Sequence, residues 1–299
     1  MKRQRLLTKE AMARFLALCC VTVVIVATFS LLFFITRKGI STFTDFGVSL
    51  LEFLTARVWR PDRLPEEGGP AIGVVPFLVG SFTVSGLAVL IAGPLGIATA
   101  IFMAEVSPVW GEKIMRPVVE ILVGIPSVVY GWIGLSVLVP LVRQYLGGLG
   151  FSLLSAGLVL SVMILPTVTS LSCDALKSLP RDLKEAAYAL GCTRWQVIRG
   201  VLVPAALPGI LTGLILGMAR AFGEALAVQM VIGNVYSMPR SLLSPGITLT
   251  TGLTMEMGNT IDGSLWNSAL WSMALVLLLF SLGFIGLVRL VSRAGGYRT

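Results

Sequence analysis

Long apolar runs alternate with short polar segments along this 299-residue chain. Six of the runs are long enough to cross the hydrocarbon core of a bilayer, which takes roughly 20 helical residues. The pattern therefore predicts an all-α integral membrane protein with six transmembrane helices, at residues 15–35, 77–104, 117–142, 151–172, 205–232 and 266–291.

The composition supports a membrane protein. The chain is 56% hydrophobic and 13% charged, with a mean hydropathy of +0.90. Soluble domains carry about 25% charged residues. A net charge of +8 would suggest nucleic-acid binding in a soluble protein, but here the basic residues gather at the ends of the predicted spans, as expected for anchoring at a membrane surface.

The basic N-terminal segment and the run after it resemble a signal peptide at first. The apolar run 15–35 is too long for such a leader, however, and it is followed by Arg37 and Lys38 without a small-residue cleavage site. We therefore interpret it as a retained first helix, followed by a loop at 36–76 and by a core at 77–291 that holds the other five helices.

Lys and Arg are about twice as frequent on the side of the loop 174–204 as on the opposite side, and such residues favour the cytosol. The sequence therefore predicts a bacterial plasma or inner membrane protein with a cytosolic N-terminus (1–14), a cytosolic C-terminus (292–299) and a cytosolic loop at 174–204. The loop 36–76 and the loop 233–265 are then extracytoplasmic, either as connectors or as contacts for a soluble partner.

Three predicted spans contain helix breakers, at 93–94, 124–126 and 165–167. Each proline frees a backbone carbonyl, which neighbours or water must satisfy inside a membrane. Kinked packing is one interpretation, and a kinked translocation path is the other.

Gly209, Gly213 and Gly217 form a smooth face on the fifth span, which predicts close packing with another helix, either in this chain or in a partner. Glu120 lies one turn from Arg116, which predicts a structural ion pair.

The chain contains no histidine and no GxxxxGK[ST] phosphate-binding loop. The first absence excludes sites and triads that need imidazole, and the second argues against ATP hydrolysis by this chain. Its four cysteines form no CxxC pair, and two of them lie inside an apolar run, so a disulfide framework is not expected. We expect a non-enzymatic chain that binds neither a metal nor another cofactor.

The segment 174–204 is the most informative part of the sequence. It predicts two short helices around Gly191, a residue that permits a sharp turn. The first carries Asp182 and the run Glu185, Ala186, Ala187 and Leu190. The second carries Trp195 on an apolar face, with Arg194 and Arg199 toward solvent. Small alanines would let such a helix enter a tight groove on a partner, although an ordinary amphipathic loop would share part of this pattern.

Arg220 and Glu224 lie among apolar residues of the fifth span. A charge at the centre of a membrane helix costs roughly 2.5–3.5 kcal/mol on insertion scales, so such residues face a cavity or a partner. Their spacing places them on one helix face, either as a structural ion pair or as an oxyanion site. In the second case Arg220 would bind the anion, and Glu224 would accept a hydrogen bond from a protonated oxyanion such as phosphate.

The spacing of Glu185-Ala186-Ala187, Gly191 and Val201-Leu202-Val203-Pro204 resembles the signature of ABC importer permeases. That resemblance implies a type I ABC importer permease fold, in which this segment is the coupling helix that docks on an ATPase. The residues expected to contact the ATPase are Asp182, Glu185, Ala186, Ala187, Leu190, Gly191 and Trp195.

Three stretches resemble the phosphate-specific transport permeases more narrowly: 120–131, 185–195 and 220–234. They are more similar to the PstC type than to the PstA type. The resemblance implies a heterodimer with a PstA-type permease, a PstB-type ATPase dimer that binds ATP and Mg²⁺, and a PstS-type phosphate-binding protein outside. Two alternatives remain open: a permease for another oxyanion (molybdate, sulfate or phosphonate), or a membrane sensor or scaffold subunit in phosphate signalling.

Overall fold

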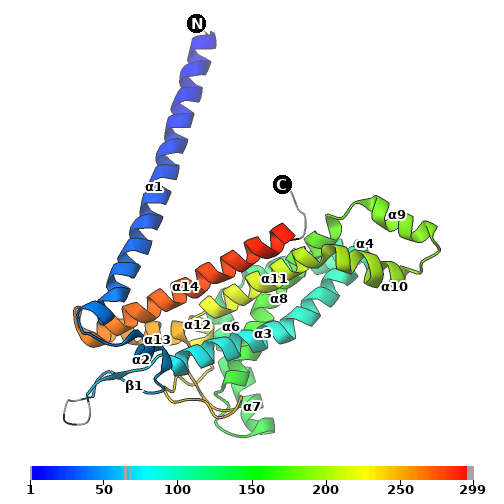
Figure 1. Ribbon diagram of the computed structural model, residues 1–299. Coiled ribbons are helices and arrows are strands. Elements are labelled where there is room, and N and C mark those ends of the chain that lie inside the picture. Colours follow the sequence, from blue (N-terminus) through cyan, green and yellow to red (C-terminus); the bar gives the residue numbers. More distant parts are fainter. Residues whose placement is uncertain (1, 64–65, 67–68, 295–299) are drawn as a thin grey trace.

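The computed structural model describes residues 2–63, 66 and 69–294 (Figure 1). Within these residues, six helical stretches are long and apolar enough to span a membrane, as expected for an all-α integral membrane protein. They are Arg14–Thr44, Val75–Val106, Ser127–Leu146, Leu153–Lys177, Arg194–Gly223 and Leu265–Ser292.

The longer helices are α1 (Lys2–Thr44), α3 (Val75–Ile101), α8 (Leu153–Lys177), α11 (Val203–Gly223) and α14 (Leu265–Ala294). Shorter helices connect or extend them: α2 (Leu50–Thr55), α4 (Pro108–Trp110), α5 (Arg116–Gly124), α6 (Ser127–Ile133), α7 (Val139–Leu146), α9 (Arg181–Ala189), α10 (Arg194–Val197), α12 (Leu226–Gln229) and α13 (Leu249–Glu256). Five further short turns are wound more widely or more tightly than an α-helix: η2 (Phe102–Val106), η3 (Gly111–Met115), η4 (Gly134–Leu138), η5 (Ile198–Leu202) and η6 (Met257–Asn259).

A small hairpin lies at the opposite end of the molecule from α9 and α10 (Figure 1). Its strands β1 (Trp59–Arg60) and β2 (Ala71–Ile72) are antiparallel, with Trp59 opposite Ile72. We call the two ends of the molecule the hairpin end and the α9 end.

The centre of the fold is the packing of α3 and α11 against α8. Small residues bring these helices together: a Cβ on Gly157 of α8 would lie 2.5 Å from Leu87 Cδ2 on α3. The glycine face of α11 is used in the same way. A Cβ on Gly209 would lie 2.5 Å from Ala175 Cβ, and one on Gly213 would lie 3.1 Å from Leu171 Cβ. The predicted smooth face is therefore covered by α8 of the same chain.

The three predicted breakers behave differently. Pro94 lies inside α3 and Pro166 inside α8, and neither interrupts its helix. Pro126 does interrupt the third span, so that α5 ends at Gly124 and the apolar helix starts at Ser127 rather than at residue 117.

A tyrosine repairs the backbone at this interruption. Pro126 has no N–H to offer the carbonyl of Leu122, four residues earlier. The Tyr130 hydroxyl donates to that carbonyl instead, at 2.8 Å.

Within α5, the predicted pair of Arg116 and Glu120 is formed, with Arg116 Nε 3.2 Å from Glu120 Oε1.

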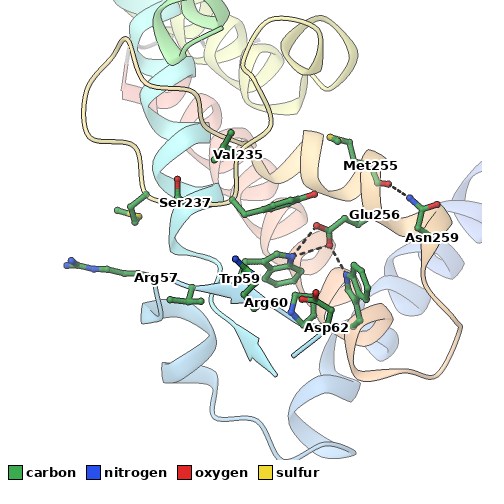
Figure 2. A pocket seen from close by; sticks show the side chains of 14 residues that line it. Arg57, Trp59, Arg60, Asp62, Val235, Ser237, Met255, Glu256 and Asn259 are labelled. Atoms are coloured by element: carbon green, nitrogen blue, oxygen red, sulfur yellow. Dashed lines mark hydrogen bonds between the residues drawn. The ribbon is translucent and has the colours of Figure 1, made fainter. Parts of the chain in front are cut away.

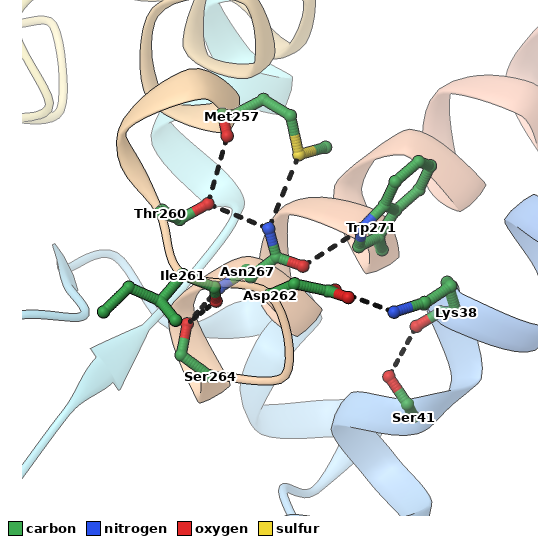
Figure 3. A network of polar contacts seen from close by, with 9 residues as sticks. All are labelled: Lys38, Ser41, Met257, Thr260, Ile261, Asp262, Ser264, Asn267 and Trp271. Carbon is green, nitrogen blue, oxygen red and sulfur yellow. Dashed lines mark hydrogen bonds and ion pairs between the residues drawn. The ribbon is translucent and has the colours of Figure 1, made fainter.

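The helix α1 contacts the rest of the chain mainly through its C-terminal part (Figure 1). There the Ser272 hydroxyl donates to the Gly39 carbonyl at 2.6 Å, and the rings of Phe34 and Trp271 meet edge to face. Lys38 Nζ lies 2.8 Å from Asp262 Oδ1, beside the hydrogen bonds of Asn267 (Figure 3).

Candidate functional site: the α9–α10 corner and the end of α11

The helices α9 and α10 form a corner that projects from one end of the molecule (Figure 1). Ala187 is 6% exposed and packs in a cluster with Val197 and Ile198. Leu190 is 85% exposed and Trp195 is 62% exposed. Exposed apolar side chains gathered at one projecting corner are typical of a protein contact. The remaining expected contact residues, Asp182, Glu185, Ala186 and Gly191, are also exposed in this corner.

Gly191 makes the corner possible. Its φ of +80° lies in the left-handed region, which a residue with a Cβ adopts only with strain. The Gly191 N–H donates to the Tyr188 carbonyl at 2.9 Å, and the Cys192 N–H donates to the Ala187 carbonyl at 3.3 Å. This pair of bonds is a Schellman motif, which satisfies carbonyls that the end of α9 leaves open. The second helix then starts at once, since the Thr193 N–H donates to Gln196 Oε1 at 2.8 Å.

Glu105, at the end of the second span, anchors this corner, although no sequence pattern singled it out. Glu105 is 8% exposed, and its carboxylate forms an ion pair with Lys184 of α9. Arg194 of α10 donates to the backbone carbonyls of Glu105 and Val106, the latter at 2.8 Å. Arg194 is exposed, as expected on the solvent side, and its guanidinium also binds the end of the second span.

Arg220 lies near mid-depth of the helical bundle. Its Nη1 donates to Thr167 Oγ1 of α8 at 3.0 Å. Thr167 lies about 21 Å from the first residue of α8 and about 15 Å from the last, at 1.5 Å per residue. Arg220 is nevertheless exposed on the surface of this chain. A cation at this depth that faces outward needs a cavity or a partner.

The structure does not form the predicted pair between Arg220 and Glu224. The fifth span ends at Gly223 rather than at residue 232, and the backbone of Glu224 is extended, with ψ of 130°. The shared helix face is lost for this reason. Glu224 Oε1 instead accepts from the Ala227 N–H at 3.1 Å, and the Glu224 carbonyl accepts from Thr250 Oγ1 at 2.7 Å. Among the described residues, no ion pair links Arg220 to Glu224.

Six apolar helices and a projecting corner with exposed apolar side chains are typical of a multi-pass membrane protein that contacts a partner. Comparisons with known proteins specify the class. Residues 92–294 match the family described as binding-protein-dependent transport system inner membrane component. The chain belongs to this family of ABC importer permeases, which are non-catalytic inner membrane subunits that work with an ATPase and a substrate-binding protein.

Individual relatives agree with the family. The probable ABC transporter permease protein YqgH of Bacillus subtilis (strain 168) is 54% identical over 291 residues, covering 97% of this chain and 93% of that protein. The phosphate transport system permease protein PstC of Mesorhizobium japonicum is 35% identical over 269 residues, covering 82% and 78%.

Solved structures resemble the fold. A permease chain of the inward-facing MetNI methionine ABC transporter is similar with a TM-score of 0.54 and 22% identity, covering 73% of this chain and 94% of that chain. The type I ABC importer permease fold is thereby confirmed.

Proposed function

We propose that this chain is the PstC-type permease of an ATP-driven importer of inorganic phosphate. The choice of cargo is supported by Arg220, an exposed guanidinium at mid-depth whose hydrogen-bond partner among the described residues is the neutral hydroxyl of Thr167. Arg presents five N–H donors in a planar fork that suits tetrahedral oxyanions. The similarity to proteins named as phosphate permeases supports the same cargo.

Glu224 has a separate part in this proposal. One of its oxygens accepts from the Ala227 N–H at the start of α12, and a carboxylate has room for further hydrogen bonds. The remaining capacity suits an oxyanion that still carries a proton. Phosphate carries one at neutral pH, and sulfate does not. Arg220 would bind the charge, and Glu224 would select for the proton.

The α9–α10 corner is the proposed contact with a PstB-type ATPase dimer. ATP and Mg²⁺ bind to that dimer and not to this chain. Asp182, Glu185, Ala186, Ala187, Leu190, Gly191 and Trp195 form this contact. The α9 end and both termini then lie in the cytosol, and the hairpin end lies outside. A PstA-type permease completes the membrane dimer, and a PstS-type protein delivers phosphate.

Uptake of labelled phosphate by proteoliposomes that contain the whole complex tests the proposal. We expect Arg220→Ala to abolish uptake while ATP hydrolysis by the complex persists, and Arg220→Lys to retain part of the uptake. Unlabelled sulfate, molybdate and phosphonate should compete poorly. Undiminished uptake in the Arg220→Ala complex would overturn the site, and stronger competition by another oxyanion would overturn the cargo. Normal phosphate uptake by cells that lack this chain would favour a sensor or scaffold subunit.

A further inference from the structure

A pocket of about 790 Å³ lies at the hairpin end, away from Arg220. Residues from β1, from the loop after α12, from α13 and from the start of α14 line it (Figure 2). Its interior is largely apolar and aromatic, with Trp59, Tyr236 and Trp266 among the lining residues.

The base of the pocket is built around one carboxylate. Glu256 is 6% exposed and accepts hydrogen bonds from the Nε1–H of Trp59 at 3.1 Å and of Trp266 at 2.7 Å (Figure 2). Tyr236 lies against the same group, and burial together with its hydrogen bond to Glu256 raises the pKa of the phenol. One carboxylate therefore ties four segments of the chain together and fixes the walls of the pocket relative to one another.

The rim of the pocket carries an excess of positive charge. Arg57 and Arg60 are exposed, and neither forms an ion pair with any residue that the structure describes. Among the described lining residues, Asp62 is the acidic residue on the rim. Two guanidinium groups that form no ion pair with a described residue, beside an apolar interior, suit a surface that offers carboxylates around an apolar side chain. A free anion inside the pocket would meet the Glu256 carboxylate, so the interior suits an uncharged group.

The helix α13 connects the pocket to Glu224, which follows the end of α11. This eight-residue helix begins at Leu249 and ends at Glu256. At its start, Thr250 donates to the Glu224 carbonyl at 2.7 Å, and further along Thr254 donates to Gln229 Oε1 at 3.3 Å. An occupant that displaces the base of the pocket would therefore shift the backbone that follows α11.

We propose that this pocket docks an acidic surface loop of the importer's substrate-binding protein. The carboxylates of that loop would bind Arg57 and Arg60, and an apolar side chain would enter between Trp59 and Tyr236. The inference rests on the proposed function only for the orientation of the chain and the presence of a binding protein. It does not depend on phosphate as the cargo.

The test uses the whole complex in nanodiscs and its own purified binding protein, titrated with and without bound substrate. We expect the double variant Arg57→Glu, Arg60→Glu to weaken binding by about tenfold or more, because like charges repel across an interface. ATP hydrolysis without the binding protein should stay unchanged. The double variant Arg57→Lys, Arg60→Lys should bind at an intermediate level, because lysine keeps the charge and loses the fork.

The matched control is Arg143→Glu, which reverses an exposed charge on α7 at the same end of the molecule. We expect it to bind like the unmodified complex. Unchanged binding by the doubly reversed variant would overturn the proposal, as would an equal loss in the Arg143→Glu complex. Because binding is measured directly, this result can fail or succeed independently of phosphate uptake.

Discussion

The Lys184 ammonium of α9 forms an ion pair with the Glu105 carboxylate at the end of the second span. Their residues are 79 positions apart in the chain, and the pair joins the corner that projects from the α9 end to the helix that packs along α8. Movement imposed on α9 by a partner would therefore reach α3 directly, and not only through the chain that leads into α11.

Removing Lys184 should loosen this connection. Lys184→Met leaves the buried Glu105 carboxylate without its cation, and the cost should lie between those of exposed and fully buried pairs, at about 1–3 kcal/mol. We expect a lower melting temperature of the complex and less transport per ATP hydrolysed. A double-mutant cycle with Glu105→Gln measures the pair, and strictly additive effects would show that the pair contributes nothing.

Tyr130→Phe should destabilise the third span without changing its shape. The variant leaves the partly buried Leu122 carbonyl without its donor, and the cost should lie at or below the lower end of the roughly 1–3 kcal/mol of a fully buried acceptor. Thermal unfolding of the complex in detergent measures the loss. Tyr145→Phe is the control, because Tyr145 is exposed on α7. Equal stability of the two variants would mean that water satisfies the carbonyl.

Gly191→Ala should strain the α9–α10 corner through the backbone alone. No atom of this chain lies within 4 Å of a Cβ placed at Gly191, so crowding inside the chain has no part in the effect. The left-handed conformation costs a residue with a Cβ about 1–2 kcal/mol. We expect weaker stimulation of ATP hydrolysis by the binding protein, with Gly191→Asn less affected because Asn tolerates this region. Gly200→Ala, also in open space but in a helical turn, should behave normally.

Glu224→Gln separates the two parts proposed for this side chain. Glutamine keeps an oxygen that can accept from the Ala227 N–H, so the start of α12 and the melting temperature should be preserved. The negative charge is lost, and we expect phosphate uptake to fall at least tenfold. Glu224→Ala should lose both stability and uptake. Full uptake with the glutamine variant would restrict Glu224 to its structural part.

The Lys38–Asp262 pair allows a prediction about pH. Hydrogen bonding to Lys38 and its positive charge lower the pKa of Asp262 below its usual 3.8. Stabilisation by a carboxylate whose pKa is lowered in the folded state is complete above the unfolded value and disappears as the pH falls through the folded one. We therefore expect Asp262→Asn to lower the melting temperature by a small amount that stays constant from pH 5 to pH 8. A difference that changes over this range would contradict the pair.

Hydrophobic length alone predicts the six spans, because a bilayer demands long apolar helices whatever the neighbouring contacts are. The sequence does not show which proline interrupts a helix. Pro94 and Pro166 lie inside helices that pack against each other, whereas Pro126 has Tyr130 to satisfy the carbonyl that it frees. That difference depends on tertiary neighbours.

The dependence on tertiary neighbours also explains why the sequence predicts a pair that does not form and does not predict the role of Glu105. The pairing of Arg220 with Glu224 assumes a continuous helix. The helix instead ends at Gly223, and Thr250 donates a hydrogen bond to the Glu224 carbonyl that follows it. The sequence does not predict the role of Glu105, because no basic residue lies one helical turn away from it. Its partner Lys184 is distant in the chain. A buried carboxylate near a span end is a signal only once a basic residue is known to face it.

The divergence of α1 from α14 has a practical consequence. The two helices meet near Gly39 and separate toward the N-terminus of α1 (Figure 1). Apolar side chains are exposed along α1, so we expect acyl chains or the helices of another subunit to fill the space between the two helices. Cys19 and Cys20 are free thiols exposed on that part of α1. They are native attachment points for spin labels or cross-linkers that would report which molecules occupy that space.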